Sequence, residues 1–366
     1  MKTVSEISVG LGERGYTISV GPGLLDRVGE RARSLGFESP VPIIADSQVA
    51  PLYGDRVRQS LEQAGFRSEV LVFPAGEPAK TLDTVARLYD GMVRLRPERR
   101  SGLVALGGGV TGDVAGFVAA TYLRGIRFIQ VPTTLLAQAD ASVGGKVGVD
   151  HPGGKNLIGA FHQPSAVLID PTTLRTLDAR QVRAGLAEVI KHGVIADRGL
   201  FEAVQEQLPR LLAADLETYC QIIPWNCRIK ADVVQQDERE SGLRAILNFG
   251  HTIGHAVEAL TGYERYLHGE AVALGMVVEA RLGEALRITP ASVTRDLEAL
   301  LRRAGFSLDR PDLSGEAMVE SMFRDKKVEK GRLRFVFPAE IGKVVIQPLE
   351  DPSRVREIWE KYAPLP

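Results

Sequence analysis

Cysteine is nearly absent from this chain, and its scarcity excludes two kinds of architecture. Only Cys220 and Cys227 occur among the 366 residues, so a framework of disulfides cannot hold the fold together. Their spacing of seven is not that of a zinc knuckle, and it places both thiols on one face of a predicted helix. We therefore expect both to be packing residues in a protein of the reducing cytosol.

An excess of charge of either sign is also lacking. The chain has 45 Lys and Arg residues against 46 Asp and Glu residues, which gives a net charge of −1. Such a balance creates no overall field that would attract nucleic acid or an anionic membrane. Any binding of anions must therefore come from local clusters of basic residues.

Long hydrophobic runs are missing as well. No segment approaches the roughly 18 consecutive apolar residues of a membrane-spanning helix. Residues 1–20 alternate as a pair of strands would, and they lack the apolar core of a signal peptide. We expect a cytoplasmic protein that neither binds a membrane nor crosses one.

The composition is otherwise that of an ordinary globular protein, with 44% hydrophobic and 25% charged residues. In the first half, short apolar segments alternate with helical patterns such as residues 81–95. This alternation predicts an α/β fold, with a parallel sheet covered by helices on both faces. The apolar segments, rich in Val, Ile and Leu, are residues 41–46, 69–73, 102–108, 127–132 and 166–170.

The pattern changes after Asp170. Helical periodicity covers residues 177–197, about 200–235, 249–262, 268–287 and 292–304, and strand patterns return only at 333–338 and 343–349. We predict two closely packed domains, an α/β domain over residues 1–177 and a mainly helical domain over residues 178–366. A cleft between them would be the default place for a ligand.

The segment LVALGGGVTGDVAGFVAA (residues 103–120) predicts a strand, a glycine turn and a helix. Its glycines match the pattern G-x-G-x-x-G, which lets backbone N–H groups approach a pyrophosphate at the start of a helix. The acidic residue that usually follows about 20 positions later is missing. Asp46, at the end of an earlier strand, could bind the ribose instead, and Glu77 and Lys80 lie in a further loop that could reach the cofactor. A tight turn without a ligand is the alternative.

A second glycine-rich segment, residues 138–161, carries six glycines and the charged residues Asp140, Lys146, Asp150 and Lys155. We predict a long ordered loop, and ordered loops of this length tend to be functional. Lys146 and Lys155 could hold a phosphate or a carboxylate. Ordinary solvated lysines are the alternative.

Two histidines, His251 and His255, stand four residues apart and therefore on one face of a predicted helix. Both could bind one zinc ion. Thr252 stands where the metalloprotease pattern H-E-x-x-H requires Glu, so that class is disfavoured. Glu188 and His268 are further candidate ligands. A metal site is indicated, but the spacing alone leaves open which three groups form it.

Basic residues accompany these candidates in the second half of the chain. Exposed surface charge would explain each of them taken singly. Together with the lysines of residues 146–155, they predict a basic pocket for a phosphorylated, acidic small molecule. These residues are Lys191, Lys230, Arg244, Lys326 and Lys327.

Six stretches of the sequence together resemble the 3-dehydroquinate synthase family of sugar-phosphate cyclases. They follow the family's order over about residues 40–345, and each is long and low in degeneracy. The resemblance implies an N-terminal Rossmann-like NAD-binding domain, a C-terminal mainly helical domain that binds metal and substrate, an active site between them, and a homodimer. The stretches are LGGGVTGDVAGFVAATYLRGI, QVPTTLLAQADASVGGKVGVDHPGGKNLIGAFHQP, GLAEVIKHGVIAD, ILNFGHTIGHAVE, LHGEAVALGM and DKKVEKGRLRFVFP.

The same resemblance implies which groups hold the cofactors. Zn²⁺, or Co²⁺ in its place, would be bound by Glu188, His251 and His268. His255 would line the substrate site and assist proton transfer instead. NAD would be bound by Asp46, Glu77, Lys80, Gly109, Val110, Thr111, Gly112, Asp113, Thr133, Thr134, Asp140, Lys146, Lys155, Thr173, Leu174, Arg175 and Thr176.

The implied reaction converts 3-deoxy-D-arabino-heptulosonate 7-phosphate into 3-dehydroquinate and phosphate, in the shikimate pathway. NAD takes a hydride from the C5 carbinol, phosphate leaves by β-elimination, the hydride returns, and an intramolecular aldol step closes the ring. Arg124 would reach the phosphate across a dimer interface. The substrate would also contact Asp140, Lys146, Asn156, Lys191, Lys230, Arg244, Asn248, His255 and Lys327, of which Lys146, Lys191, Lys230, Arg244, Asn248 and His255 are predicted to be catalytic.

Three alternatives remain. Other sugar-phosphate cyclases share the scaffold, but some replace the asparagine that matches Asn248 by an acid or lose the lysine that matches Lys327, and this chain keeps both. A metal-dependent polyol dehydrogenase of the glycerol dehydrogenase type would share the glycine loop, yet a neutral polyol needs fewer cations. A non-catalytic NAD- or zinc-binding protein would not need the proton-transfer groups at Lys146, Asn248 and His255.

Overall fold

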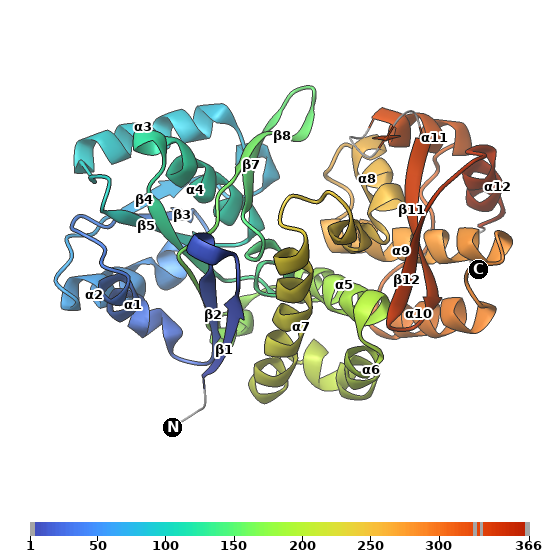
Figure 1. The fold of residues 1–366 in the computed structure, drawn as a ribbon, viewed down its shortest axis with the longest axis horizontal. Helices are drawn as coiled ribbons and strands as arrows, with labels where there is room; N and C mark the ends of the chain where they lie inside the picture. The colour runs from blue at the N-terminus through green and yellow to red at the C-terminus, as the bar shows by residue number, and fades with distance from the viewer. Residues whose placement is uncertain (1–3, 325–327, 330–331, 363–366) are drawn as a thin grey trace. The chain divides into compact units, whose positions relative to one another are not determined.

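The computed structural model of the chain describes residues 4–324, 328–329 and 332–362, and Figure 1 shows its fold with most of the longer helices and strands labelled. The described residues form two compact units. Unit 1 contains the residues up to Leu177 together with Tyr219–Glu238, and unit 2 contains Asp178–Thr218 and the residues from Arg239 onward. Within the described ranges, no helix is long and apolar enough to span a membrane.

A seven-stranded sheet runs through unit 1 in the order β1-β2-β9-β6-β5-β3-β4. β1 and β2 pair in the antiparallel sense, and every other neighbouring pair is parallel. The predicted N-terminal strand pair and the predicted parallel sheet are therefore confirmed. The strands are β1 (Ser5–Val9), β2 (Tyr16–Val20), β3 (Ile43–Asp46), β4 (Val70–Phe73), β5 (Gly102–Gly107), β6 (Arg127–Pro132) and β9 (Ala166–Ile169).

Helices cover both faces of this sheet (Figure 1). Neighbouring residues of a strand point to opposite faces, so Ile43 packs in a buried cluster with α1 and α2, whereas Ile44 packs in a second cluster with α3 and α4. Burial on both sides explains why these strands are near-continuous apolar runs in the sequence. The longer helices of unit 1 are α1 (Val28–Ser34), α2 (Asp55–Gln63), α3 (Leu82–Leu95), α4 (Gly109–Thr121) and most of α7 (Leu216–Gln236).

Short helical turns connect these elements of unit 1, and several of them carry predicted site residues. They are η1 (Gly12–Arg14), η2 (Leu24–Arg27), η3 (Ala50–Gly54), η4 (Glu77–Ala79), η5 (Tyr122–Arg124), η6 (Ala137–Ala141) and η7 (Pro171–Thr176).

Residues 138–161 are not the long loop that their glycines predict. After η6 they form an antiparallel hairpin of β7 (Lys146–His151) and β8 (Gly154–Phe161). Gly148 lies opposite Gly159, and a Cβ atom on Gly148 would lie 2.5 Å from the carbonyl oxygen of Ile158. The glycines therefore serve the close approach of two strands, and their number concealed the strand alternation of Val147 and Val149.

Residues 200–235 are not one continuous helix either. α6 (Arg198–Leu212) and α7 are separated at Ala214, whose φ of 52° is left-handed. Most of α7 belongs to unit 1, which interrupts the predicted second domain. Side chains of α7 explain this grouping, because Asn226 Nδ2 donates to the Ala139 carbonyl at 2.6 Å and Cys227 Sγ donates to the Gln138 carbonyl at 3.4 Å.

The two thiols both lie on α7. Cys227 is fully buried, as predicted, and burial raises the pKa of its thiol to about 12. Cys220 is only partly buried, and neither forms a disulfide.

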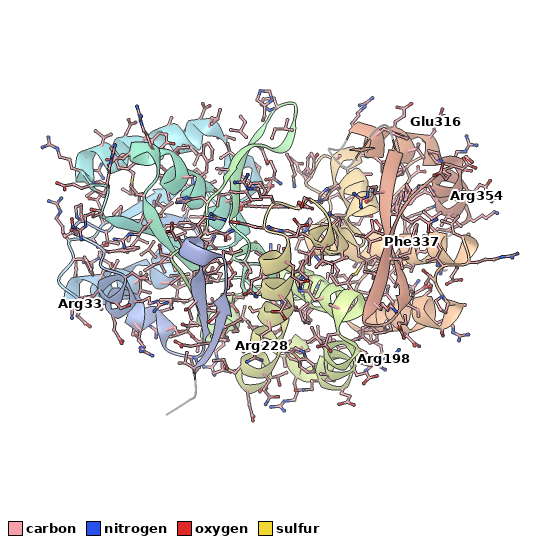
Figure 2. All side chains as sticks on the ribbon, viewed as in Figure 1. Arg33, Arg198, Arg228, Glu316, Phe337 and Arg354 are labelled. Atoms are coloured by element: carbon pink, nitrogen blue, oxygen red, sulfur yellow. The ribbon has the colours of Figure 1, made fainter. Side chains whose placement is uncertain are left out.

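Unit 2 is mainly helical and contains a three-stranded sheet in the order β10-β11-β12. The predicted C-terminal hairpin is confirmed, since β11 and β12 pair in the antiparallel sense. Phe337 of β11 is buried and stacks on Phe335 with 5.9 Å between ring centres (Figure 2). Its elements are α5 (Ala179–Ala196), α6, η8 (Leu243–Asn248), α8 (His251–Leu260), α9 (His268–Ala285), α10 (Ala291–Arg303), α11 (Gly315–Arg324), β10 (Val328–Glu329), β11 (Arg332–Glu340), β12 (Lys343–Pro348) and α12 (Ser353–Lys361).

Candidate functional site

The glycine loop of unit 1 joins β5 directly to α4, as the pattern predicts. A Cβ atom on Gly107 would collide with the side chain of Thr111, and one on Gly108 would lie 3.1 Å from Cγ2 of Thr134. The absence of side chains therefore lets the chain turn tightly into the helix. The first backbone N–H groups of a helix have no partner within it, so this end of α4 suits an anion.

Asp46 lies at the end of β3, the strand beside β5, and hence near the glycine loop. One carboxylate oxygen accepts a hydrogen bond from the hydroxyl of Thr111 at 2.9 Å. The other accepts hydrogen bonds from the backbone N–H groups of Gln48 and Val49 at 2.9 and 3.0 Å. These bonds fix the orientation of an acidic group at the carboxyl edge of the sheet, where doubly wound folds bind nucleotides.

A charged network joins α4, η4 and the β7–β8 hairpin. Lys80 Nζ lies 2.7 Å from Asp113 Oδ2 and also donates to Oδ1 of Asn156, while Lys155 Nζ lies 3.3 Å from Glu77 Oε1. The side chain of Lys80 is only 5% exposed. Burial alone would lower the pKa of Lys80, but the carboxylates of Asp113 and Glu77 outweigh it and hold the pKa above its ordinary value. Lys80 therefore stays charged and links the three elements.

Asp150 supports this network at an irregularity of the hairpin. The strand register shifts between Val149 and His151, and Asn156 opposite has a left-handed φ of 53°. Asp150 Oδ1 accepts a hydrogen bond from the backbone N–H of Asn156 at 2.7 Å, and its own N–H donates to the carbonyl of Lys80 at 2.8 Å. Bulges of this kind often redirect side chains next to functional sites.

The remaining residues predicted to bind NAD lie on loops that follow β6 and β9. Thr133 donates its N–H to the Gly107 carbonyl at 2.9 Å, and the Thr134 hydroxyl accepts from the Ala137 N–H at 3.2 Å. Gln138 links this region to η7 by donating to the Thr173 hydroxyl at 2.9 Å. In η7, Leu174 is buried while Arg175 is exposed. The structure thus gathers these segments at the carboxyl ends of neighbouring strands.

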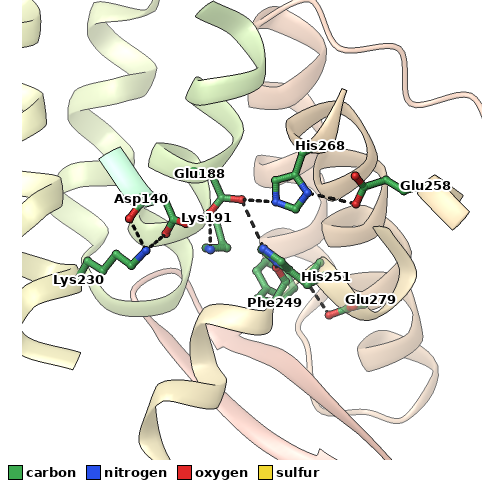
Figure 3. Close-up of polar contacts among 10 residues, drawn as sticks. Asp140, Glu188, Lys191, Lys230, Phe249, His251, Glu258, His268 and Glu279 are labelled. Atoms are coloured by element: carbon green, nitrogen blue, oxygen red, sulfur yellow. Dashed lines mark hydrogen bonds and ion pairs between the residues drawn. The ribbon is translucent and has the colours of Figure 1, made fainter. Parts of the chain in front are cut away.

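Two further predicted residues of unit 1 form an ion pair. Lys230 of α7 lies 2.7 Å from Asp140 Oδ1 and also donates to the Asp140 carbonyl (Figure 3). Its side chain is 7% exposed, so the pair is largely removed from solvent. Lys146, at the start of β7, is exposed.

Arg124 closes the short turn η5 and is exposed. Leu123 and Arg124 both have left-handed backbone conformations, with φ of 50° at Leu123 and 69° at Arg124. Residues other than glycine rarely adopt the left-handed region of φ and ψ, and such backbone strain is often found at functional sites.

Three predicted metal ligands come together in unit 2. Glu188 Oε1 lies 3.6 Å from Nε2 of His251 and 3.7 Å from Nε2 of His268 (Figure 3). Glu188 is fully buried, and among the described residues its carboxylate oxygens accept no hydrogen bond, although Lys191 forms an ion pair with Oε2. A buried carboxylate that faces two imidazole nitrogens is the donor set of a zinc-type metal site.

His255 does not belong to this group. Its ring lies 5.5 Å from the ring of His251, but the potential metal group that contains Glu188 and His251 has His268 as its third member and does not include His255. His255 is instead close to His268 and Glu258, which form a second potential donor cluster. The two histidines with helical spacing therefore have different surroundings.

Two other predicted residues of unit 2, Arg244 and Asn248, lie in η8. Arg244 is buried, and Asn248 Nδ2 donates to Glu240 Oε1 at 2.8 Å. Lys191 lies one helical turn from Glu188 on α5 and is 1% exposed. Lys327 lies outside the described residues.

Several residues next to these groups were not recognised in the sequence. Glu258 and Glu279 bond to the starts of the two helices that carry the histidines, and Glu240 bonds to the predicted substrate residue Asn248. Asp150, which the sequence indicated only as a charge of the glycine-rich segment, bonds to Asn156. Glu258 follows His251 by seven positions, so helical periodicity was a signal for it. For Glu279, which bonds to a different helix, the sequence contains no comparable signal.

Comparison with known proteins decides the family. The 3-dehydroquinate synthase N-terminal family matches residues 70–184 and the C-terminal family matches residues 185–328. The chain is 50% identical to the 3-dehydroquinate synthase of Crocosphaera subtropica over 360 residues, which is 96% of this chain and 98% of that one. It is 52% identical to that of Pelotomaculum thermopropionicum over 93% and 92% of the two chains. The chain belongs to the 3-dehydroquinate synthase family. The family and enzyme class predicted from the motifs are thus confirmed.

Solved structures of related cyclases have the same fold. A 2-deoxy-scyllo-inosose synthase in complex with carbaglucose-6-phosphate, NAD⁺ and Co²⁺ superposes with a TM-score of 0.89 at 28% identity, over 98% of this chain and all of that one. The 2-epi-5-epi-valiolone synthase of Streptomyces hygroscopicus, with NAD⁺ and Zn²⁺, gives 0.87 at 27% identity, over 99% and 98%. A probable glycerol dehydrogenase of Sinorhizobium meliloti, at 0.64 and 17% identity over 93% and 95%, shares the fold alone.

Proposed function

We propose that the protein is a cytoplasmic, homodimeric enzyme that converts 3-deoxy-D-arabino-heptulosonate 7-phosphate into 3-dehydroquinate and phosphate. NAD and a divalent metal ion, Zn²⁺ or Co²⁺, would be its cofactors. The observation that carries the proposal is the group of Glu188, His251 and His268, whose buried carboxylate faces two imidazole nitrogens at 3.6 and 3.7 Å. Identity of about 50% to 3-dehydroquinate synthases, against 28% and 27% to two solved cyclases that make other rings, supports this substrate.

The donor set fits a metal ion because Oε1 of the fully buried Glu188 accepts no hydrogen bond among the described residues and faces two imidazole nitrogens. Lys191 forms its ion pair with the other oxygen, so Oε1 still needs a positive partner. When bound, the metal would hold substrate hydroxyls and make the one that is oxidised more acidic. Lys191, paired with the other oxygen of Glu188, would bring a further positive charge to the same place.

The fit of NAD to unit 1 rests on the glycine loop at the start of α4 and on Asp46 beside it. NAD, when bound, would accept a hydride from the substrate and return it within the same turnover. The glycine loop would bind the pyrophosphate through backbone N–H groups, and Asp46 would accept hydrogen bonds from the ribose. Lys80, Asp113 and Lys155 would hold the surrounding loops in place.

The substrate carries a carboxylate and a phosphate, and the predicted residues supply matching cations. Lys146, Lys191, Lys230 and Arg244 would stabilise the charges of carboxylate, phosphate and developing enolate. Asp140 would hold a hydroxyl while it keeps Lys230 in position. His255 would move a proton, Asn156, Asn248 and Lys327 would bind polar groups of the substrate, and Arg124 would reach the phosphate bound to the other subunit.

The substrate assignment is tested with a panel of sugar phosphates and the metal-loaded enzyme. Phosphate release is expected from 3-deoxy-D-arabino-heptulosonate 7-phosphate and not from glucose 6-phosphate or from a seven-carbon ketose phosphate that lacks the carboxylate. Faster phosphate release from either of the latter two would assign the chain to one of the sister cyclases.

Replacing Lys80 by methionine is expected to weaken NAD binding and to lower stability. The change leaves the carboxylate of Asp113 without its partner at 2.7 Å. Loss of one member of a buried pair costs roughly 3–5 kcal/mol, and the cost here should be smaller because the side chain of Asp113 is 25% exposed. Thermal unfolding and calorimetric titration with NAD measure the two effects. Lys361→Met, at an exposed position of α12, is the control. Wild-type NAD affinity in Lys80→Met would show that the network does not support the cofactor.

A further inference from the structure

The helices α8 and α9 each begin at a proposed metal ligand. His251 is the first residue of α8 and His268 is the first residue of α9. Each helix also carries a buried glutamate that bonds to the start of the other helix. Glu258 of α8 accepts from His268 Nδ1 at 3.2 Å, and Glu279 of α9 accepts from the Gly250 N–H at 2.8 Å (Figure 3).

Glu258 determines which nitrogen of His268 is available. A carboxylate can only accept, so the His268 ring donates from Nδ1, and in the neutral ring Nε2 then carries the lone pair. That nitrogen is the one that lies 3.7 Å from Glu188 Oε1. Glu258 is 4% exposed, so water competes little for this bond. The pair therefore holds the ring in the tautomer and orientation that a metal ion requires.

Glu279 acts on the backbone that carries His251. Its two carboxylate oxygens accept from the N–H groups of Gly250 and Ile253, at 2.8 and 3.4 Å, at the start of α8. A negative charge is stabilising at this end of a helix, and Glu279 is fully buried. The ring of His251 is held as well, because its Nδ1 contacts the Phe249 carbonyl at 3.1 Å. Its Nε2 is thereby directed toward Glu188.

Glycines allow the two helices to approach closely enough for these bonds. A Cβ atom on Gly275 of α9 would collide with the Gly250 carbonyl oxygen, and one on Gly254 of α8 would lie 3.1 Å from the Ala271 carbonyl oxygen. The contact places the start of each helix beside the later turns of the other. The two glutamates are therefore related by the same antiparallel packing.

We propose that Glu258 and Glu279 are reciprocal positioning residues, which set His268 and His251 in metal-binding geometry before the ion arrives. The inference rests on the proposed function, because that function supplies the metal. Neither glutamate belongs to the group of Glu188, His251 and His268 that would hold the ion. Their loss would change the affinity for metal, since partners that orient ligating histidines typically contribute about 10–100-fold to it.

The test is a titration of the metal-free full-length protein with Zn²⁺ against a chromophoric chelator, and with Co²⁺ alone by visible absorption. Glu258→Gln and Glu279→Gln are each expected to weaken binding by about 10–100-fold. Glu264→Gln, which removes the same charge at an exposed position between the two helices, is expected to bind as the wild type does. Thermal unfolding of the metal-free proteins separates this effect from a general loss of structure.

Wild-type metal affinity in folded Glu258→Gln would overturn the inference, because that variant alone removes the charge behind His268. Should Glu279→Gln fail to fold, the metal affinities of Glu258→Gln and Glu264→Gln still test the inference. A failure of the proposed function has a different signature. In that case His251→Ala would bind Zn²⁺ as the wild type does, or the wild type would bind none.

Discussion

Replacing His251 by alanine is expected to remove bound metal and activity together, whereas replacing His255 is expected to remove activity and leave the metal bound. Nε2 of His251 lies 3.6 Å from Glu188 Oε1, and His255 is not a member of the Glu188 group. Loss of one of three ligands should abolish stable binding of the ion. Loss of a proton-transfer group lowers turnover by roughly 10²–10⁴-fold.

Metal content after gel filtration and the rate of phosphate release are measured for both variants. His151→Ala, at an exposed position of the β7–β8 hairpin with no proposed role, serves as the control and should retain both properties. Equal loss of metal from the His251 and His255 variants would contradict the assignment. It would restore the simpler interpretation in which the two histidines on one helix face bind the ion together.

Replacing Gly275 by alanine is expected to destabilise the protein and to damage the metal site at the same time. The new Cβ atom would collide with the Gly250 carbonyl oxygen, which is backbone and can move only if α8 moves. Overpacking of this kind lowers the free energy of unfolding by about 1–3 kcal/mol. We expect a value near the upper end of this range, because the atom in the way belongs to the backbone. For a domain of this size, the thermal midpoint should fall by roughly 6–12 °C. The affinity for Zn²⁺ should fall with it, because Gly250 precedes His251.

Gly54→Ala is the matched control for this change. Gly54 has helical φ and ψ angles, and its Cβ atom would meet only an ordinary contact at 3.4 Å from Val70 Cγ2. Alanine at such a site is expected to be neutral or slightly stabilising. A thermal midpoint for Gly275→Ala equal to that of Gly54→Ala would show that α8 and α9 separate without cost.

The sheet of unit 1 could be predicted because strands that are buried on both faces consist of near-continuous apolar residues. Strands such as β5 are apolar at nearly every position, and the turn signals that bound them are local. The β7–β8 hairpin was missed for the opposite reason. There the glycines that allow Gly148 and Gly159 to face each other replace the side chains that would have shown a strand.

The candidate site could be predicted only as a set of residue types. Helical spacing places His251 and His255 on one face, but it does not show that Glu188 of α5 and His268 of α9 approach His251. Contacts between distant elements are set by packing, which one sequence does not reveal. The same limit explains why Glu279, which stabilises the start of another helix, had no detectable signal, while the resemblance to a known family supplied the ligands directly.

The central claim is that the hydride taken from the substrate returns within each turnover, so NAD is not consumed. The most direct test follows phosphate release from 3-deoxy-D-arabino-heptulosonate 7-phosphate, with trace NAD and zinc, while NADH absorbance is recorded. We expect phosphate in large excess over NAD, no lasting NADH, and 3-dehydroquinate as the product. NADH that accumulates in step with the substrate consumed, or no phosphate from the folded and metal-loaded protein, would contradict the claim.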